Sequence, residues 1–191
     1  MSLVVYDGTA LYADRFIMVR ELGSDVFSIA TETKLVHSEF IAIAILGVSP
    51  HKANRDEALK LVASNVYLYE THNEFVFFDG NNPKAHQIMF QSTNTTYFVL
   101  THAGLYKFVH DGFHVMDDRI EVAQGSGSIA YTIARQSGLS VEESYYAAAF
   151  VERTAGPIGN FCKRSELKDI KTHFEEHERK KREQHDPAQG Q

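Results

Sequence analysis

Apolar residues in the first fifty positions occur in short runs, which is the pattern of β-strands. The runs LVVY and TALYA flank Asp7-Gly8, a strong two-residue signal for a β-hairpin. Residues 25–30 and 40–46 have the same character, and FIAIAILGV is apolar throughout. A helix that spans a bilayer needs about 20 apolar residues, so we interpret this shorter run as a buried strand.

Helical periodicity replaces this pattern in the middle and later parts of the chain. Asn54 is a favourable N-cap, and apolar residues then recur at helical spacing for about five turns. Residues 128–136 and 141–153 predict two consecutive helices. Ser140 and Glu143 form a capping box ahead of the second of these, so one helix ends and the next begins within a few residues.

Extended patterns return between residues 74 and 124. The segments EFVFFDG, HQIMF, TTYFVLT, GLYKFVHDGFHVM and RIEVAQ are separated by Gly, Asn and Asp signals, and we expect a strand in each. A chain that runs through strands, a helix, more strands and two helices predicts an α+β fold. Because such sheets need cover on their outer faces, the simplest architecture is a four-layer αββα sandwich of two mainly antiparallel sheets between helical layers.

The chain of 191 residues has a suitable length for one domain, which we place at residues 1–170. Residues 171–191 are interpreted as a charged helical C-terminal extension with a flexible tail, within a helix expected over residues 165–184. Its apolar residues end near Phe174. A solvated helix end is the preferred interpretation of this segment, and a binding element is the alternative.

Composition and charge exclude several classes of function. Hydrophobic residues make up 43% and charged residues 23%, values typical of a folded globular protein. The net charge of -6 provides no basic face for phosphates, so we expect no nucleic-acid partner. The single cysteine, Cys162, cannot form an intramolecular disulfide, and no signal peptide is apparent. A cytoplasmic protein without a membrane partner is the resulting prediction.

Four motifs follow one another in a characteristic order. Gly8 is followed by TALYADR, which contains Asp14; TKLV contains Lys34; FIAIAILG ends in a glycine; and GSGSIAYTIARQSGLSVEESYYAAAFVERTAGPIGNF follows later. In this order they resemble the proteasome β-subunit family of the N-terminal nucleophile hydrolases, over roughly residues 3–170. The resemblance implies the αββα sandwich, self-assembly into a homo-oligomeric ring, and hydrolysis of peptide or amide bonds. It also implies a peptide substrate and an unfoldase as partners.

The same resemblance indicates five site residues. In such hydrolases the side chain of the first residue attacks an amide and its free α-amine acts as the base. Ser2 follows the initiator methionine, which is normally removed before a small residue, and is therefore the candidate nucleophile. The resemblance implies that Asp14 orients Lys34, that Lys34 lowers the proton affinity of the nucleophile, and that Ser126 and Glu152 lie near the amine. One residue supplies both nucleophile and base, so no cofactor is expected.

Other features favour a non-catalytic scaffold or interaction subunit that has lost the nucleophile. Ala155 occupies a position where active members of the family carry a hydroxyl group. The predicted hairpin turn would pair residues whose numbers sum to about 15, which places Ser2 opposite Ala13. The resemblance also implies a first strand about three residues short of the family's, so Ser2 is expected to fall about 10 Å short of Lys34. Ser2 would then be an ordinary residue at the start of a strand. Lys34 would be either a surface lysine or one half of a buried pair.

Two pairs of histidines have a spacing that is compatible with metal ligands. His173 and His177 have the spacing of one helix face, while His110 and His114 flank an Asp-Gly turn. Two ligands are too few for a zinc site, so we predict no metal centre from either pair.

Overall fold

The structure is a computed structural model that describes residues 3–20, 27–31, 34–47, 52–74, 83–90, 93–151 and 158–185. Within these ranges the strands form a four-stranded sheet, a five-stranded sheet and a separate hairpin, and every strand pair is antiparallel. The four-stranded sheet has the order β10 (Val122–Gly125), β1 (Leu3–Tyr6), β2 (Ala10–Asp14) and β11 (Ile158–Lys163). The five-stranded sheet has the order β5 (Leu35–His37), β6 (Ile41–Leu46), β7 (Thr96–Thr101), β8 (Leu105–Val109) and β9 (Gly112–Met116). The hairpin consists of β3 (Phe16–Arg20) and β4 (Phe27–Thr31).

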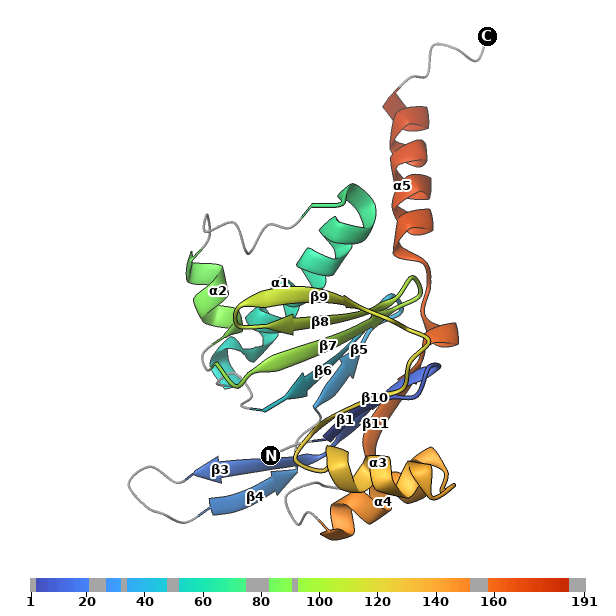
Figure 1. Cartoon of the computed structure of the whole chain (residues 1–191). Coiled ribbons are helices and arrows are strands. Elements are labelled where there is room, and N and C mark those ends of the chain that lie inside the picture. Colours follow the sequence, from blue (N-terminus) through green and yellow to red (C-terminus); the bar gives the residue numbers. More distant parts are fainter. Residues whose placement is uncertain are drawn as a thin grey trace.

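Helices cover the outer face of each sheet. The described helices are α1 (Lys52–His72), α2 (Pro83–Met89), α3 (Ser128–Gln136), α4 (Val141–Val151) and α5 (Ile170–His185), with a short 3-10 turn at Arg164–Glu166. Helices α3 and α4 lie on the four-stranded sheet, and α1 and α2 lie on the far side of the five-stranded sheet (Figure 1). The predicted αββα sandwich is therefore confirmed.

The central strands are apolar on both faces because both faces are covered. In β6, Ile41, Ile43 and Ile45 belong to the core beneath the helices, whereas the alternate residues Ala42 and Ala44 belong to the core between the sheets. Side chains alternate between the two faces of a strand, so a strand in an inner layer requires apolar residues at every position. This requirement explains the uninterrupted apolar run in the sequence.

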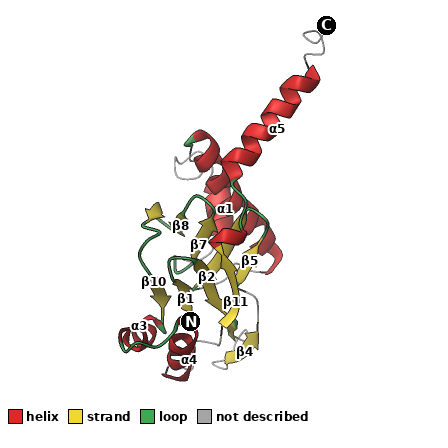
Figure 2. Cartoon of the chain, turned by 90° about the vertical axis from the view of Figure 1, so that its right-hand side faces the viewer, coloured by secondary structure: helices red, strands yellow, loops and turns green. Residues whose placement is uncertain are grey.

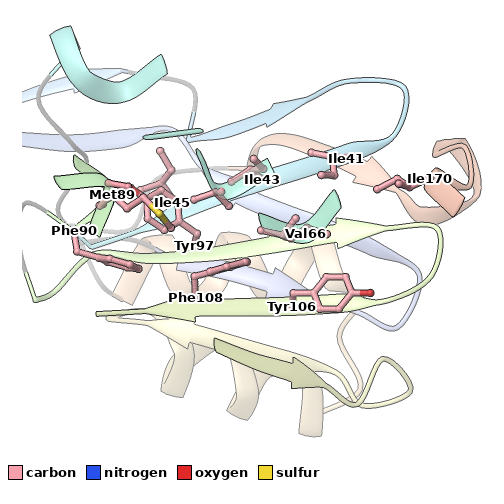
Figure 3. Packing of buried hydrophobic residues seen from close by; sticks show 13 residues of the cluster. Ile41, Ile43, Ile45, Val66, Met89, Phe90, Tyr97, Tyr106, Phe108 and Ile170 are labelled. Atoms are coloured by element: carbon pink, nitrogen blue, oxygen red, sulfur yellow. Dashed lines mark hydrogen bonds between the residues drawn. The ribbon is translucent and has the colours of Figure 1, made fainter. Parts of the chain in front are cut away.

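Three apolar cores separate the four layers. The core between the five-stranded sheet and its helices contains buried aromatic and aliphatic side chains from six elements, including Val66, Met89, Tyr97, Phe108 and Ile170 (Figure 3). The core between the sheets is formed by apolar side chains of both sheets, with two or three buried members each from β1, β2, β6 and β7. The third core lies between the four-stranded sheet and its helices, and its buried members are Leu3, Val5, Tyr131, Tyr145 and Ala148.

The first hairpin forms where it was predicted, but its register was predicted incorrectly. The N–H of Asp7 donates to the carbonyl of Ala10 at 3.2 Å, so the two-residue loop is Gly8-Thr9, and Gly8 has the positive φ of 92° that this loop requires. The carboxylate of Asp7 accepts the N–H groups of Thr9 and Ala10 at 2.8 and 2.7 Å, which places Asp7 before the loop. Paired residue numbers consequently sum to 17, as in Val4 with Ala13, and the predicted sum of 15 is wrong.

Two further segments, HQIMF and EFVFFDG, were predicted as strands. HQIMF was predicted as a strand but lies mainly in α2. Pro83 begins this helix, a position at which proline is favoured because its missing N–H group is not needed there, and this signal outweighs the β-favouring residues that predicted a strand. Most of EFVFFDG lies outside the described residues, so that predicted strand is not tested.

Helix α5 extends away from the sandwich (Figure 2). Its first residue, Ile170, is buried, and Phe174 packs against Tyr67 and His72 of α1. Beyond this point the helix has no apolar residue, but three glutamates each precede a basic residue by four positions, a spacing that stabilises helices: Glu175 with Arg179, Glu176 with Lys180, and Glu178 with Arg182. No helix among the described residues has both the length and the apolar character needed to cross a bilayer.

Candidate active site

A buried ion pair joins the two sheets. Lys34 immediately precedes β5, and its Nζ lies 2.9 Å from Oδ1 of Asp14, the last residue of β2. The side chains of Lys34 and Asp14 are only 4% and 0% exposed. The carbonyl of Lys34 accepts the N–H of Ile45 in the neighbouring strand, which anchors the lysine backbone in the five-stranded sheet. Of the two interpretations left open for Lys34, the structure shows the buried pair.

The start of β1 lies at the same carboxylate. The backbone N–H of Leu3 donates to Oδ1 of Asp14 at 3.3 Å, and this is the oxygen that the ammonium group of Lys34 contacts. The distance between the Leu3 nitrogen and Lys34 Nζ therefore cannot exceed the sum of their two distances to Oδ1 of Asp14. The peptide bond from residue 2 ends at this nitrogen, although Ser2 itself lies outside the described residues.

The corrected register changes the expectation for the residues that lie opposite the end of β2. That expectation placed Ser2 opposite Ala13, but Ala13 pairs with Val4. The shift of two residues brings Leu3, rather than the initiator methionine, to Asp14. The expected shortfall of about 10 Å between Ser2 and Lys34 stays a prediction, because Ser2 lies outside the described residues.

Ser126 follows β10 at the turn into α3. Leu3 pairs with Gly125 in the sheet, so the turn containing Ser126 lies beside the point where the chain enters β1. Ser126 is half-buried and lines a groove of about 400 Å³ between α3 and α4. The structure therefore brings Asp14, Lys34 and the turn at Ser126 to the beginning of one strand, while Glu152 and Ala155 lie outside the described residues.

Tyr145 is a site residue that the sequence did not reveal. Its hydroxyl donates to the carbonyl oxygen of Leu3 across 2.5 Å, and its side chain is fully buried. Burial raises the pKa of Tyr145 well above its ordinary value, and the negative charge of Asp14 adds to this shift, so the hydroxyl stays protonated and can donate. Its place in YYAAA predicts a buried helix face, but no local pattern indicates a partner 142 residues away.

This arrangement can support acyl transfer at the start of β1. A lysine ammonium held in a dry environment favours the ionised form of a neighbouring hydroxyl and therefore strengthens it as a nucleophile. Asp14 fixes the position of that ammonium. Among the described residues, no group of three or more His, Cys, Asp or Glu side chains could hold a metal ion.

Comparison with known proteins provides a relationship of fold. No protein-family profile matches the chain, and no curated protein sequence matches it. Among solved structures, the eukaryotic HslV from Trypanosoma brucei is 13% identical, with a TM-score of 0.53 over 85% of this chain and 97% of that chain. The Thiobacillus denitrificans protein BPH is 14% identical, with a TM-score of 0.50 over 85% of this chain and 98% of that chain.

The chain has a proteasome β-subunit-like fold. This is the fold of the N-terminal nucleophile hydrolases that the order of motifs resembled, and both matched structures are covered over almost their whole length. At these identities the likeness concerns the fold alone. In this fold, the start of β1 is the place where the backbone nitrogen of Leu3, the carboxylate of Asp14 and the ammonium group of Lys34 meet.

Proposed function

We propose that this protein is a proteasome-like subunit that hydrolyses amide bonds with Ser2 as its N-terminal nucleophile. The observation that carries this proposal is the shared oxygen of Asp14, which accepts from Lys34 Nζ at 2.9 Å and from Leu3 nitrogen at 3.3 Å. Residue 2 is therefore attached at the place where the ammonium group is held. Peptides or small amides are the proposed substrates, and the chemistry needs no cofactor.

The proposed reaction begins after removal of Met1. Oγ of Ser2 forms a bond to the amide carbonyl carbon, and its proton passes to the α-amine, whose ordinary pKa near 8 suits a base at neutral pH. The same proton then passes to the leaving nitrogen as the C–N bond breaks, which leaves an ester on Ser2. Water attacks this ester, the acid is released, and Oγ regains a proton.

The remaining residues have supporting roles in this proposal. Lys34 stabilises negative charge on Oγ, and Asp14 holds Lys34 in place. Ser126 and Glu152 are proposed to orient the α-amine. For Ser126, the pairing of the preceding residue, Gly125, with Leu3 supports this role.

A non-catalytic scaffold or interaction subunit is the second candidate. The residue whose nitrogen contacts Asp14 is Leu3, which has no nucleophilic side chain, and the ion pair is almost fully buried. These two features favour a structural role for the pair, in which the fold has been retained without the chemistry.

Intact mass spectrometry distinguishes the two candidates. We expect the protein, expressed without an N-terminal tag, to have lost Met1 and to gain the mass of one β-lactone molecule when it is treated with this acylating probe. The Ser2→Ala variant should lose Met1 but gain no mass, because only the nucleophile has been removed. Retention of Met1, or an unmodified but folded wild-type protein, would establish the scaffold instead.

Self-assembly is the second part of the proposal, and the exposed face of α3 and α4 supports it. Phe150 is 88% exposed and Ile129 is 74% exposed, and the face carries further exposed apolar side chains: Ile133, Tyr146 and Val151. We call these five side chains the α3–α4 face. Their exposed area is on the order of 600 Å², which is at the upper end for an apolar patch on a monomer and somewhat below the roughly 800 Å² that each partner buries in a stable interface.

A second copy of the chain is the proposed partner of the α3–α4 face. Two copies can meet face to face about a two-fold axis, in which case Phe150 of each copy can enter the groove between α3 and α4 of the other. Assembly of this kind would contribute to the proposed homo-oligomer. An unfoldase partner and a cytoplasmic location remain part of the proposal, the latter supported by the single cysteine.

Phe150→Asp is expected to weaken self-association at least 100-fold, because a charge would replace an aromatic anchor in a desolvated contact. Sedimentation velocity across a concentration series measures this change. Val115→Asp, which changes an exposed apolar residue on β9, is the matched control and should leave assembly intact. An unchanged association of the Phe150 variant would show that another surface holds the copies together.

A further inference from the structure

On the edge of β1 that faces β2, the backbone of Leu3 is held by two side chains and not by a neighbouring strand. The last backbone pair between β1 and β2 is Val4 with Ala13. At Leu3, Oδ1 of Asp14 accepts the N–H group and the hydroxyl of Tyr145 donates to the carbonyl oxygen. The first described residue of the strand is therefore clamped at both of its polar backbone atoms.

The environment of Tyr145 makes this clamp rigid. Leu3, Tyr145 and Ala148 belong to one buried core, and the rings of Tyr145 and Tyr131 meet edge to face with centroids 6.1 Å apart. A buried carbonyl that loses a hydrogen-bond donor does not readily recover the bond from water, so the clamp is costly to open. Helix α4 in this way fixes the position of a backbone atom that lies one residue after Ser2.

We propose that Tyr145 is a positioning residue for Ser2: its hydroxyl holds the Leu3 carbonyl so that the nucleophile and its α-amine remain aligned with Lys34. This inference rests on the proposed function, because it assigns a role within the same site. Tyr145 touches neither the substrate nor the reacting atoms in this scheme. It acts through Leu3, while Asp14 fixes both the Leu3 nitrogen and the Lys34 ammonium.

Rigid placement matters because rates of acyl transfer depend steeply on geometry. A displacement of about 1 Å can reduce a rate roughly 100-fold while binding of the reactant changes little. Loss of the Tyr145 hydroxyl should accordingly lower the rate of reaction at saturation without changing the affinity for the acylating compound. A residue with only a structural role would change the melting temperature and leave both kinetic constants unaltered below that temperature.

The test is the kinetics of β-lactone acylation in the full-length chain, followed by intact mass. For Tyr145→Phe we expect the limiting rate of acylation to fall about 10- to 100-fold, with the half-saturating concentration changed less than twofold. Tyr131→Phe is the matched control, since its hydroxyl donates to Glu121 rather than to β1. Both constants should remain within twofold of wild type in that control.

A second variant and a wild-type reference separate the outcomes. Tyr145→Met keeps an apolar side chain of similar length without a hydroxyl, and it should show the same loss of rate if the phenylalanine variant does not fold. A reactive wild type together with unaltered rates in a folded Tyr145 variant would overturn this inference and leave the proposed function standing. An unreactive wild type would overturn both.

Discussion

Lys34→Met is expected to lower the free energy of unfolding by about 3–5 kcal/mol and to abolish acylation of Ser2. The substitution removes the ammonium group 2.9 Å from the buried carboxylate of Asp14, and loss of one partner of a buried ion pair is strongly destabilising. The lost positive charge is also the group proposed to favour the ionised hydroxyl. Urea denaturation measures the first effect, and β-lactone labelling at a temperature where the variant is folded measures the second.

The double variant Asp14→Asn/Lys34→Met separates stability from chemistry. It removes both charges, while the amide oxygen of asparagine can still accept the N–H of Leu3, so we expect most of the lost stability to return without any reactivity. Lys168→Met is the control for removal of a surface pair, because Lys168 and Glu39 are both exposed and solvent screens their attraction, so we expect little change in stability. A single Lys34 variant as stable as this control would contradict the effect that we attribute to burial.

The layers of the fold were predictable because burial leaves a direct pattern in the sequence. A strand covered on both faces must be apolar at every position, as in Ile41–Leu46, and a helix that begins at a capping box can be placed from its own residues, as at Ser140 and Glu143. Segment 83–89 was less predictable. Its β-favouring residues conflict with the helix-starting proline, and packing against the core decides between them.

The candidate site was predictable only in part because its contacts are long-range. The resemblance indicated Asp14 and Lys34, but the position of Ser2 relative to them depends on the hairpin register, which the side chain of Asp7 shifts by two residues. The contact between Tyr145 and Leu3 has no local signature at all, since it depends on α4 packing against β1. Such contacts follow from the assembled layers and not from any single segment.

Gly47→Ala is expected to lower the free energy of unfolding by about 3 kcal/mol and the melting temperature by roughly 10 °C. Gly47 follows β6 with a φ of 85°, a conformation that costs other residues about 1–2 kcal/mol. In addition, a Cβ atom at this position would lie 1.9 Å from the carbonyl oxygen of Asn94, which precedes β7. This oxygen belongs to the backbone next to the β6–β7 ladder, so it cannot move away without disturbing the central sheet.

Gly138→Ala isolates the contribution of backbone strain to this effect. Gly138 has a similar φ of 88°, but no atom lies within 4 Å of the position that its Cβ would occupy. We therefore expect this variant to lose only about 1 kcal/mol, and a thermal melt of the two variants side by side measures the difference. Equal losses would mean that strain alone limits position 47. A larger loss of stability at Gly47 would show that FIAIAILG requires its glycine because the backbone of Asn94 approaches it closely.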